Sequence, residues 1–324
     1  MKNTAKILIC ITLILAFVAA LVSCSPDFEG LEVHVATLNG TTGFGMAQLI
    51  GQDKNNKTAI DYTFYVRDDA SLILSGLQTG AYDIAALPTN AAANLYQKTN
   101  GGIKILAVNT LGVLYVVTNT KNSGVASLSD LDGKTVYCPA QNPMFIFKGL
   151  CAKAGVNVTV DTTYAEPAAL RDAFASGKVE YAVLPEPMVT VVSTKRPSTT
   201  VVVDLTKEWS NYFGNNSLMQ GCVVARTEFI ENNPEAVKKF LEEYKASVDF
   251  AIEDPTTAGK MIVAAKIFEN DIIAAAALPK CNIKYIDGDE MATSLNTFFE
   301  ALYSINPQAV GGKVPDAGIY YKAE

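Results

Sequence analysis

The chain has 324 residues, a formal net charge of −7 and one histidine, His34. An acidic chain lacks the basic surface that nucleic acids require, so we expect no nucleic-acid partner. A chain of this length exceeds what one small core organises, and we expect two lobes.

The first 23 residues have the pattern of an export signal. Lys2 and Lys6 precede an uncharged apolar run that is short for a membrane span and ends in polar residues. The tetrad Leu21-Val22-Ser23-Cys24 is similar to a bacterial lipobox, in which the cysteine is lipid-modified and begins the mature chain. We expect a signal peptide over 1–23, a linker over 24–32 and lipidation at Cys24. An uncleaved anchor or a plain secretory signal is the alternative. Cleavage would leave 24 Lys and Arg against 33 Asp and Glu, a net charge of −9.

The remaining cysteines of the mature chain are scattered: Cys138, Cys151, Cys222 and Cys281. They form no CxxC motif and no Cys/His cluster, so we predict neither a metal site nor a cofactor. An exported chain permits disulfides. A Cys222–Cys281 or Cys138–Cys151 bond and free buried thiols all remain open.

The first strand-to-helix turn is a candidate binding element. An apolar strand over Val33–Thr37 breaks at Asn39-Gly40, and a helix begins through Thr41-Thr42-Gly43. Such a turn leaves backbone N–H groups unpaired at the positive end of a helix dipole, where a polar ligand group can bind. An ordinary helix N-cap is the alternative.

Strand and helix patterns then alternate, which predicts a parallel sheet with helices on both faces. The expected elements are strand Tyr62–Val66, helix Ala70–Thr79, strand Asp83–Leu87, helix Asn90–Lys98 and strand Lys104–Val108.

A later stretch repeats this arrangement at a constant offset of 97 residues. The corresponding landmarks are Asp69 and Glu166, Gly80 and Gly177, Asp83 and Glu180, and Leu87-Pro88 and Leu184-Pro185. Upstream of them, a strand over Thr135–Cys138 and a helix over Pro143–Ala154 parallel the first strand and helix. Glycine closes helices in many βα units, so similar composition is the alternative. Three coincident spacings favour two structurally similar lobes.

Two long apolar segments can connect the lobes. Asn109–Thr118 can leave the first lobe and Met219–Ala225 can return, with Gly112 and Gly221 as hinge candidates. Core strands with glycine at bulges are the alternative. The first lobe would then comprise 33–112 and 220–324, and the second 113–219.

Beyond residue 226 the pattern is mainly helical, and we expect these helices to cover the outside of the first lobe. They begin at Asn233-Pro234-Glu235 and continue over Thr256–Lys266, Asp271–Leu278 and Asp289–Ile305, with a short strand at Ile283–Ile286.

Several motifs taken in order carry a family resemblance. They are the lipobox, GTTGFGM, ALPTNAAANLY, NTLGVLYVVT, LSDLDGKTVYCP, AEPAALRDAFASGKVEYAVLPEP and ENNPEAVKKFLEEYKASV. Over nearly all of 31–324 the chain resembles extracytoplasmic substrate-binding proteins of ABC importers, in the group for nitrate, sulfonate, taurine and thiamine precursors. The resemblance implies the α/β type II periplasmic-binding fold, with two doubly wound lobes, two crossing hinge strands and a ligand between the lobes.

The resemblance also implies partners and a location. It implies a monomer that delivers a small molecule to an ABC permease without being an enzyme. The chain would be anchored through Cys24 to the bilayer at the outer face of the bacterial cytoplasmic membrane, or on its periplasmic side.

Two other functions remain alternatives. The fold group includes a thiamine-pyrimidine synthase, whose iron-dependent chemistry uses histidine and a cysteine-rich motif. Here His34 lies in a predicted strand, and no GxSxG, HExxH or GxxxxGK[ST] motif occurs. A surface sensor without a transporter is the other alternative.

We expect the ligand-binding residues in the loops that follow the strands, because ligands of open α/β sheets bind there. The candidates are Asn39, Thr41, Thr42, Gly43, Thr89 and Asn90 in the first lobe, Gln141, Asn142, Glu166 and Glu186 in the second, Asn109 and Gln220 on the crossing segments, and the aromatic residues Tyr115, Phe145 and Tyr164. Helix capping is the alternative for Thr42, Asn90 and Glu166.

The candidate set has many amides and hydroxyls and few cations. A carboxylate at Glu166 or Glu186 would repel an anion and suits a ligand with N–H donors. This chemistry favours a heteroaromatic or amine-bearing nutrient, such as a thiamine-type pyrimidine, over nitrate, taurine or a sulfonate.

Overall fold

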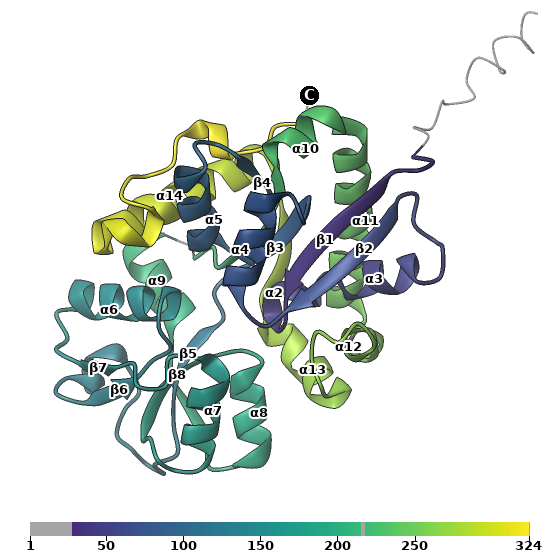
Figure 1. The fold of residues 1–324 in the computed structure, drawn as a ribbon. Helices are drawn as coiled ribbons and strands as arrows, with labels where there is room; N and C mark the ends of the chain where they lie inside the picture. Colours follow the sequence, from purple (N-terminus) through teal and green to yellow (C-terminus); the bar gives the residue numbers. More distant parts are fainter. Residues whose placement is uncertain (1–27, 215–217, 324) are drawn as a thin grey trace, which may run out of the picture.

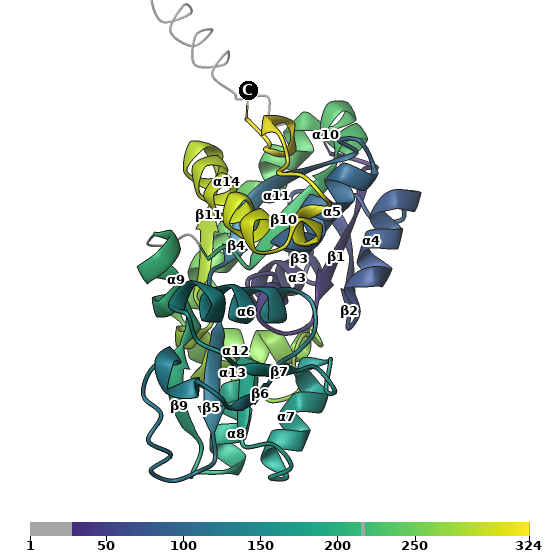
Figure 2. The ribbon, with the colours of Figure 1, turned by 90° about the vertical axis from the view of Figure 1, so that its left-hand side faces the viewer.

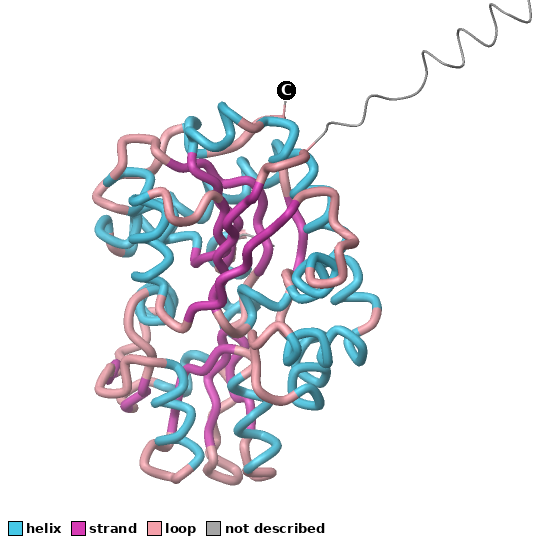
Figure 3. Tube along the Cα trace, turned by 45° about the vertical axis from the view of Figure 1, so that its right-hand side comes forward, coloured by secondary structure: helices cyan, strands magenta, loops and turns pink. Residues whose placement is uncertain are grey.

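The computed structural model describes residues 28–214 and 218–323, and its strands form two separate sheets. Figure 1 shows one sheet above the other, and Figure 3 shows helices flanking both. We call the six-stranded sheet with its helices the first lobe, and the five-stranded sheet with its helices the second lobe.

The sheet of the first lobe has the strand order β11-β4-β10-β3-β1-β2. Its strands are β1 (Glu32–Leu38), β2 (Asp61–Arg67), β3 (Ile84–Pro88), β4 (Ile103–Thr110), β10 (Gly221–Arg226) and β11 (Ile283–Ile286). β1 pairs in parallel with β2 and β3, whereas β10 is antiparallel to β3 and β4. β1, β2 and β3 are parallel as predicted, but the sheet as a whole is mixed, because β10 enters from the other lobe in the opposite direction.

The sheet of the second lobe has the strand order β7-β6-β8-β5-β9. Its strands are β5 (Leu114–Thr118), β6 (Thr135–Tyr137), β7 (Thr159–Asp161), β8 (Tyr181–Pro185) and β9 (Thr200–Asp204). β6 is parallel to β7 and β8, and β5 is antiparallel to β8 and β9.

The two sheets repeat one topology. When the first is read as β2-β1-β3-β10-β4, the second follows it strand for strand, with the antiparallel strand in fourth place both times. Ile84–Pro88 and Tyr181–Pro185 differ by the predicted 97 residues. Helices α4 (Ala70–Thr79) and α7 (Pro167–Ala175) precede these strands. The predicted structural repeat is confirmed.

Helices cover both faces of each sheet. Besides α4 and α7, the helices are α2 (Thr41–Phe44), α3 (Ala47–Asp53), α5 (Thr89–Lys98), α6 (Asn142–Ala154), α8 (Met188–Lys195), α9 (Leu205–Phe213), α10 (Thr227–Asn232), α11 (Pro234–Glu253), α12 (Pro255–Ala264), α13 (Asp271–Ala277) and α14 (Gly288–Ile305). In the first lobe, α3, α11 and α12 share one apolar cluster, and α4, α5 and α14 belong to the cluster on the opposite face. In the second lobe, α7 and α8 cover one face, and α6 and α9 cover the other.

Helix α14 joins the two lobes, which corrects the expectation that it only covers the first. It contacts β4 and also packs against α6 and α9, as Figure 2 shows. The ring centroids of Trp209 and Phe298 are 5.6 Å apart across this seam. A Cβ at Gly149 would collide with the side chain of Ile305, so glycine is required for the close approach of α6 and α14. One side of the interlobe contact is therefore a packed apolar surface.

The predicted strand over 109–118 is two strands in different sheets. β4 ends at Thr110, β5 begins at Leu114, and the three residues between them carry the chain from one lobe to the other. A Cβ at Gly112 would collide with the hydroxyl of Thr206, and a Cβ at Gly221 would meet Asn109. Both glycines are thus explained by close approach at the crossing.

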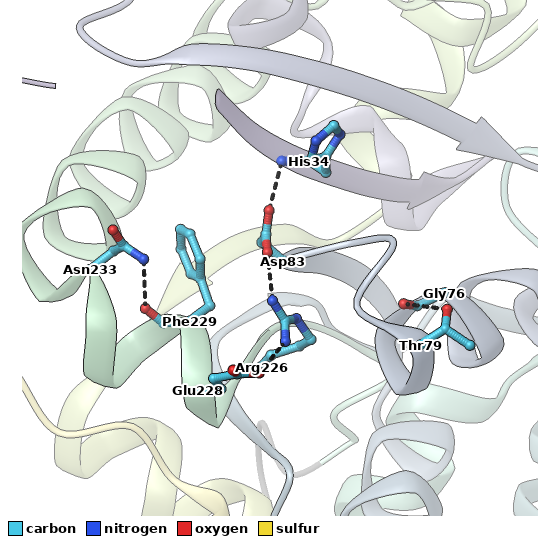
Figure 4. A network of polar contacts seen from close by, with 8 residues as sticks. All are labelled: His34, Gly76, Thr79, Asp83, Arg226, Glu228, Phe229 and Asn233. Atoms are coloured by element: carbon cyan, nitrogen blue, oxygen red, sulfur yellow. Dashed lines mark hydrogen bonds and ion pairs between the residues drawn. The ribbon is translucent and has the colours of Figure 1, made fainter. Parts of the chain in front are cut away.

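A polar network joins three strands of the first lobe at the end where β1 begins (Figure 4). The Asp83 carboxylate accepts hydrogen bonds from the backbone N–H of His34 at 3.0 Å and from Arg226 at 2.9 Å. Arg226 also pairs with Glu228 at 2.7 Å. This network ties β1, β3 and β10 together.

The four cysteines within the described residues are free and buried, so neither suggested disulfide is formed. In the same part of the chain, no helix combines the length and apolar character needed to cross a bilayer. The signal peptide and Cys24 lie outside the described residues.

Candidate functional site

The turns that follow β1 and β8 meet between the lobes. The side-chain hydroxyl of Thr41 donates a hydrogen bond of 2.6 Å to the backbone carbonyl of Glu186, and both residues are buried. Gly40, with φ +77°, ends the first strand in a conformation that favours glycine. A Cβ at Gly43 would collide with the carbonyl of Leu38, so the helical turn Thr41–Phe44 lies directly against its own strand.

The Glu186 carboxylate is held at the start of α8. One of its oxygens accepts a hydrogen bond of 3.0 Å from the backbone N–H of Thr190, and the Glu186 N–H donates to the carbonyl of Val113. Burial raises the pKa of Glu186, while the Thr190 hydrogen bond and the positive charge of Lys280 act in the opposite direction. Lys280 ends the 3-10 helix Leu278–Lys280 of the first lobe, so a first-lobe cation acts on a second-lobe carboxylate.

Tyr115 faces the same group of residues from β5. Burial, followed by the charges of Asp204 and Glu186, raises the pKa of Tyr115 to about 12. Cys281 is also near, because burial and the Glu186 charge raise the pKa of its thiol while Thr41 lowers it. The interlobe site thus combines a neutral phenol, a thiol and a buried carboxyl group.

Asn109 holds the turn after β1 in place through side-chain hydrogen bonds. Its amide donates to the carbonyl of Thr42 at 3.1 Å and to the hydroxyl of Tyr244 at 3.0 Å. Its oxygen accepts from Thr110. Asn109 is 1 % exposed, and its polar atoms are used within the protein, so it positions the turn.

Gln220 and Thr89 tie the crossing segments together. The side-chain oxygen of Gln220 accepts a hydrogen bond of 2.7 Å from the N–H of Val113. The backbone carbonyl of Gln220 accepts one from the N–H of Thr89. The Thr89 hydroxyl donates to the carbonyl of Met219. These bonds connect the outgoing segment, the returning segment and the start of α5.

Asn90 and Asn142 are buried at the first turns of α5 and α6. They are 8 % and 6 % exposed. Neither side-chain oxygen has a hydrogen-bond partner among the described residues. Buried acceptors are normally satisfied, so these two unpaired oxygens are candidates for a donor that the described residues do not supply.

The remaining candidate residues are Gln141, Phe145, Tyr164, Glu166 and Asn39. The loop before α6 is joined to the loop before α7 by a hydrogen bond from Ala140 N to Ala165 O, which brings Gln141 and Phe145 towards Tyr164 and Glu166. Glu166 is exposed and its side chain does not cap α7, whereas the equivalent Asp69 caps α4. Capping by Thr42 or Asn90 is likewise not seen. Asn39 is exposed and lines a groove beside β2.

The sequence did not predict four residues of this group: Lys280, Cys281, Thr190 and Tyr244. Lys280 and Cys281 reach the site from a segment about 240 residues after Thr41, and no local pattern predicts that contact. Thr190 could have been found, because it stands four residues after Glu186 at the start of a helix.

Comparisons with known proteins place the chain in a family. The family described as "NMT1/THI5 like" matches residues 59–258. Provisionally named binding proteins of Brucella abortus (strain 2308) and Brucella suis biovar 1 (strain 1330) are each 25 % identical over 201 residues, which is 61 % of this chain. The match spans 60 % of the length of these relatives.

Solved structures match over nearly the whole chain. An ABC transporter structure from Parabacteroides distasonis has a TM-score of 0.76 at 23 % identity, covering 90 % of this chain and 99 % of that one. The periplasmic aliphatic sulphonate binding protein of Escherichia coli has a TM-score of 0.72 at 13 % identity, covering 93 % and 94 %. At these identities the similarity establishes the fold. The chain belongs to the NMT1/THI5-like family and has the two-lobed α/β fold of periplasmic binding proteins.

Proposed function

We propose that the protein is an exported substrate-binding protein that captures a small polar ligand between its lobes and delivers it to an ABC permease. The observation that carries the proposal is the meeting of strand-end turns from two repeated lobes at Thr41 and Glu186. Ligands of α/β folds bind at such strand ends. The first lobe would comprise 33–112 and 220–324 and the second 113–219, with closure about Gly112 and Gly221.

The same proposal includes export and anchoring. Cleavage before Cys24 and lipidation of that cysteine would place a monomer on the outer face of the membrane, beside its permease. Metabolic labelling with a fatty acid tests this part, because the wild type should be labelled and Cys24→Ala should not. Equal labelling of both proteins would contradict it.

The ligand we favour offers hydrogen-bond donors. Asn90 and Asn142 present unpartnered oxygens, one from each lobe. Glu186 adds a carboxyl group, and Lys280 is the cation that acts on it. A heteroaromatic amine of the thiamine-pyrimidine type fits this chemistry. Sulfonates are the alternative, because three of the matched structures are described as sulfonate-binding proteins and helix N-termini can hold such anions.

A thermal-shift panel tests the function and the ligand class. It should include an aminopyrimidine, an aliphatic amine, taurine, an alkanesulfonate and nitrate. A true ligand at hundredfold excess over its Kd should add about 2.7 kcal/mol to the free energy of unfolding. Asn90→Ala and Asn142→Ala should each reduce the shift, whereas Asn296→Ala, on α14, should not. A shift from sulfonates alone would overturn the ligand class and leave the binding function standing.

An enzyme related to thiamine-pyrimidine synthesis and a sensor without a transporter remain the competing functions. His34 lies within β1, and its ring contacts the hydroxyl of Tyr65 at 3.2 Å. This places the histidine away from the strand-end turns that carry the candidate site. Release of a pyrimidine product after addition of iron would favour the enzyme. Absence of a neighbouring permease gene would favour the sensor.

A further inference from the structure

The edge strand β2 differs from the other sheet edges. It has seven residues, whereas β11, β7 and β9 at the remaining edges have four, three and five. Its central sequence Tyr62–Val66 is aromatic and β-branched, without charge or proline. Edge strands are usually short, charged or interrupted, because an unprotected edge is a template for another strand.

Three residues of β2 direct their backbone groups outwards. The N–H of Tyr62 donates to the Asp53 carboxylate at 3.1 Å, so this side of the residue faces away from β1. Alternate residues of a strand direct their N–H and C=O groups to the same side. Phe64 and Val66 therefore present theirs at the free edge, where no further strand pairs with β2 among the described residues.

This edge lies in an open groove of about 960 Å³. Phe64, Val66 and Arg67 of β2 line it. Ile50 of α3 also lines it, and so do residues of α4 such as Gly76. Figure 1 shows β2 at the margin of the sheet, beside α3. Leu72 of α4 also lines the groove and is 50 % exposed.

The groove has an excess of positive charge although the chain is acidic. Lys54, Arg67 and Lys266 line it, against the single carboxylate of Asp68. None of the three cations forms an ion pair with another described residue. The Arg67 guanidinium is held over the Tyr65 and Tyr82 rings, at 5.2 and 5.8 Å from their centroids. The groove is therefore suited to an extended chain with acidic side chains.

We propose that the β2 edge binds an extended acidic segment of a partner protein by strand addition. The segment would pair with the backbone of Phe64 and Val66 and place carboxylates near Lys54, Arg67 and Lys266. A second copy of this chain fits less well, because its own β2 lines an identical groove with the same three cations. This inference does not rest on the proposed transport function.

The test is an amide NMR titration of the isotopically labelled protein with the peptide acetyl-Glu-Val-Glu-Val-Glu-Val-amide. The Phe64 and Val66 resonances should shift, and their hydrogen exchange should slow. The counterpart with lysine in place of glutamate should bind at least roughly tenfold more weakly. Replacing both Lys54 and Lys266 with glutamine should weaken binding roughly fivefold, and Lys57→Gln, outside the groove, should leave it unchanged.

Three results would overturn the proposal. They are no shift at millimolar peptide, equal binding of both peptides, and shifts confined to residues away from β2. Concentration-dependent shifts of Phe64 and Val66 without peptide would also overturn it, by indicating a second copy at this edge. Thermal unfolding of each variant establishes that it remains folded, so a loss of binding reports on the groove.

Discussion

Thr41 and Glu186 lie 145 residues apart in the chain and are joined by a hydrogen bond of 2.6 Å between the two lobes. On another side of the interlobe contact, α14 packs against α6 and α9 through apolar side chains. The lobes therefore meet through a polar contact at the strand ends and an apolar seam at α14. Because an apolar seam is costly to open, separation of the lobes should break the polar contact first.

Thr41→Val removes the interlobe hydrogen bond with little change in shape. An intramolecular hydrogen bond contributes about 1 kcal/mol net, so the closed arrangement should become less stable relative to the open one by that amount. Ligand affinity should fall roughly two- to tenfold, as measured by isothermal titration calorimetry with the compound found in the thermal-shift panel. Thr293→Val, exposed on α14, is the control. Unchanged affinity in Thr41→Val would show that the bond does not contribute to the bound state.

Glu186→Gln should change the pH dependence of stability. Because burial raises the pKa of Glu186 above its ordinary value of 4.5, the folded protein holds this proton more firmly than the unfolded chain. The contribution of Glu186 to the stability of the wild type is therefore lost as pH rises from about 4.5 through the raised pKa. Glutamine does not titrate and retains an oxygen for the Thr190 N–H. The free energy of unfolding of the variant, minus that of the wild type, should rise across this window and then level off.

Urea denaturation at intervals between about pH 4 and pH 8 measures this difference. Comparison with the wild type cancels the titration of the other carboxylates, including several whose pKa is lowered, such as Asp69 and Asp130. A difference that does not change with pH would mean that Glu186 has no raised pKa in the folded protein.

The repeated architecture could be predicted because its signals are local. Helix-closing glycines and proline-ended strands recur at a fixed offset, and the observed strands Ile84–Pro88 and Tyr181–Pro185 keep that offset. The parallel-sheet prediction failed at β10 because strand direction depends on where the chain returns from. The bridging role of α14 depends on packing against α6 and α9, which an amphipathic pattern cannot specify.

The site could be predicted only in part, for a related reason. Spacing identified the turns after β1 and β8, since strand ends are visible in the sequence. It did not separate residues that face the interlobe region from those used within the protein, as Asn109 is by Thr42 and Tyr244. Nor could it bring Lys280 and Cys281 to Glu186, because that contact is made across the lobes.

Asp83→Ala should destabilise the protein substantially. It leaves the Arg226 guanidinium without its buried partner and the His34 N–H without an acceptor. Breaking a largely buried pair costs about 3 kcal/mol, somewhat less where the remaining charge keeps a second partner such as Glu228. Lys245→Ala, in the exposed pair with Asp249, should cost under about 1 kcal/mol. Equal costs in urea denaturation would contradict the role assigned to the Asp83 network.

Gly112→Ala should strain the crossing between the lobes. Its Cβ would collide with the Thr206 hydroxyl, and such overpacking costs about 1–3 kcal/mol. Adding Thr206→Ala should restore much of the loss, because it removes the atoms that collide. Gly51→Ala, in α3 with open space around its Cβ, should be neutral or stabilising by up to about 1 kcal/mol. Failure of the second substitution to rescue Gly112→Ala would place the requirement for glycine elsewhere.

In the proposed function, a ligand draws the two lobes together at their strand-end turns. The direct measurement is the distance between spin labels at Ser71 of α4 and Ala168 of α7, two exposed positions at the equivalent helix starts of the two lobes. Pulsed electron–electron double resonance without ligand should give a distance distribution that is broad or centred at long distances. Saturation with the compound that most stabilises the protein should give a single shorter distance, and Thr41→Val should shift the distribution back towards longer distances. An identical distribution with and without that compound would contradict closure of the lobes around a ligand.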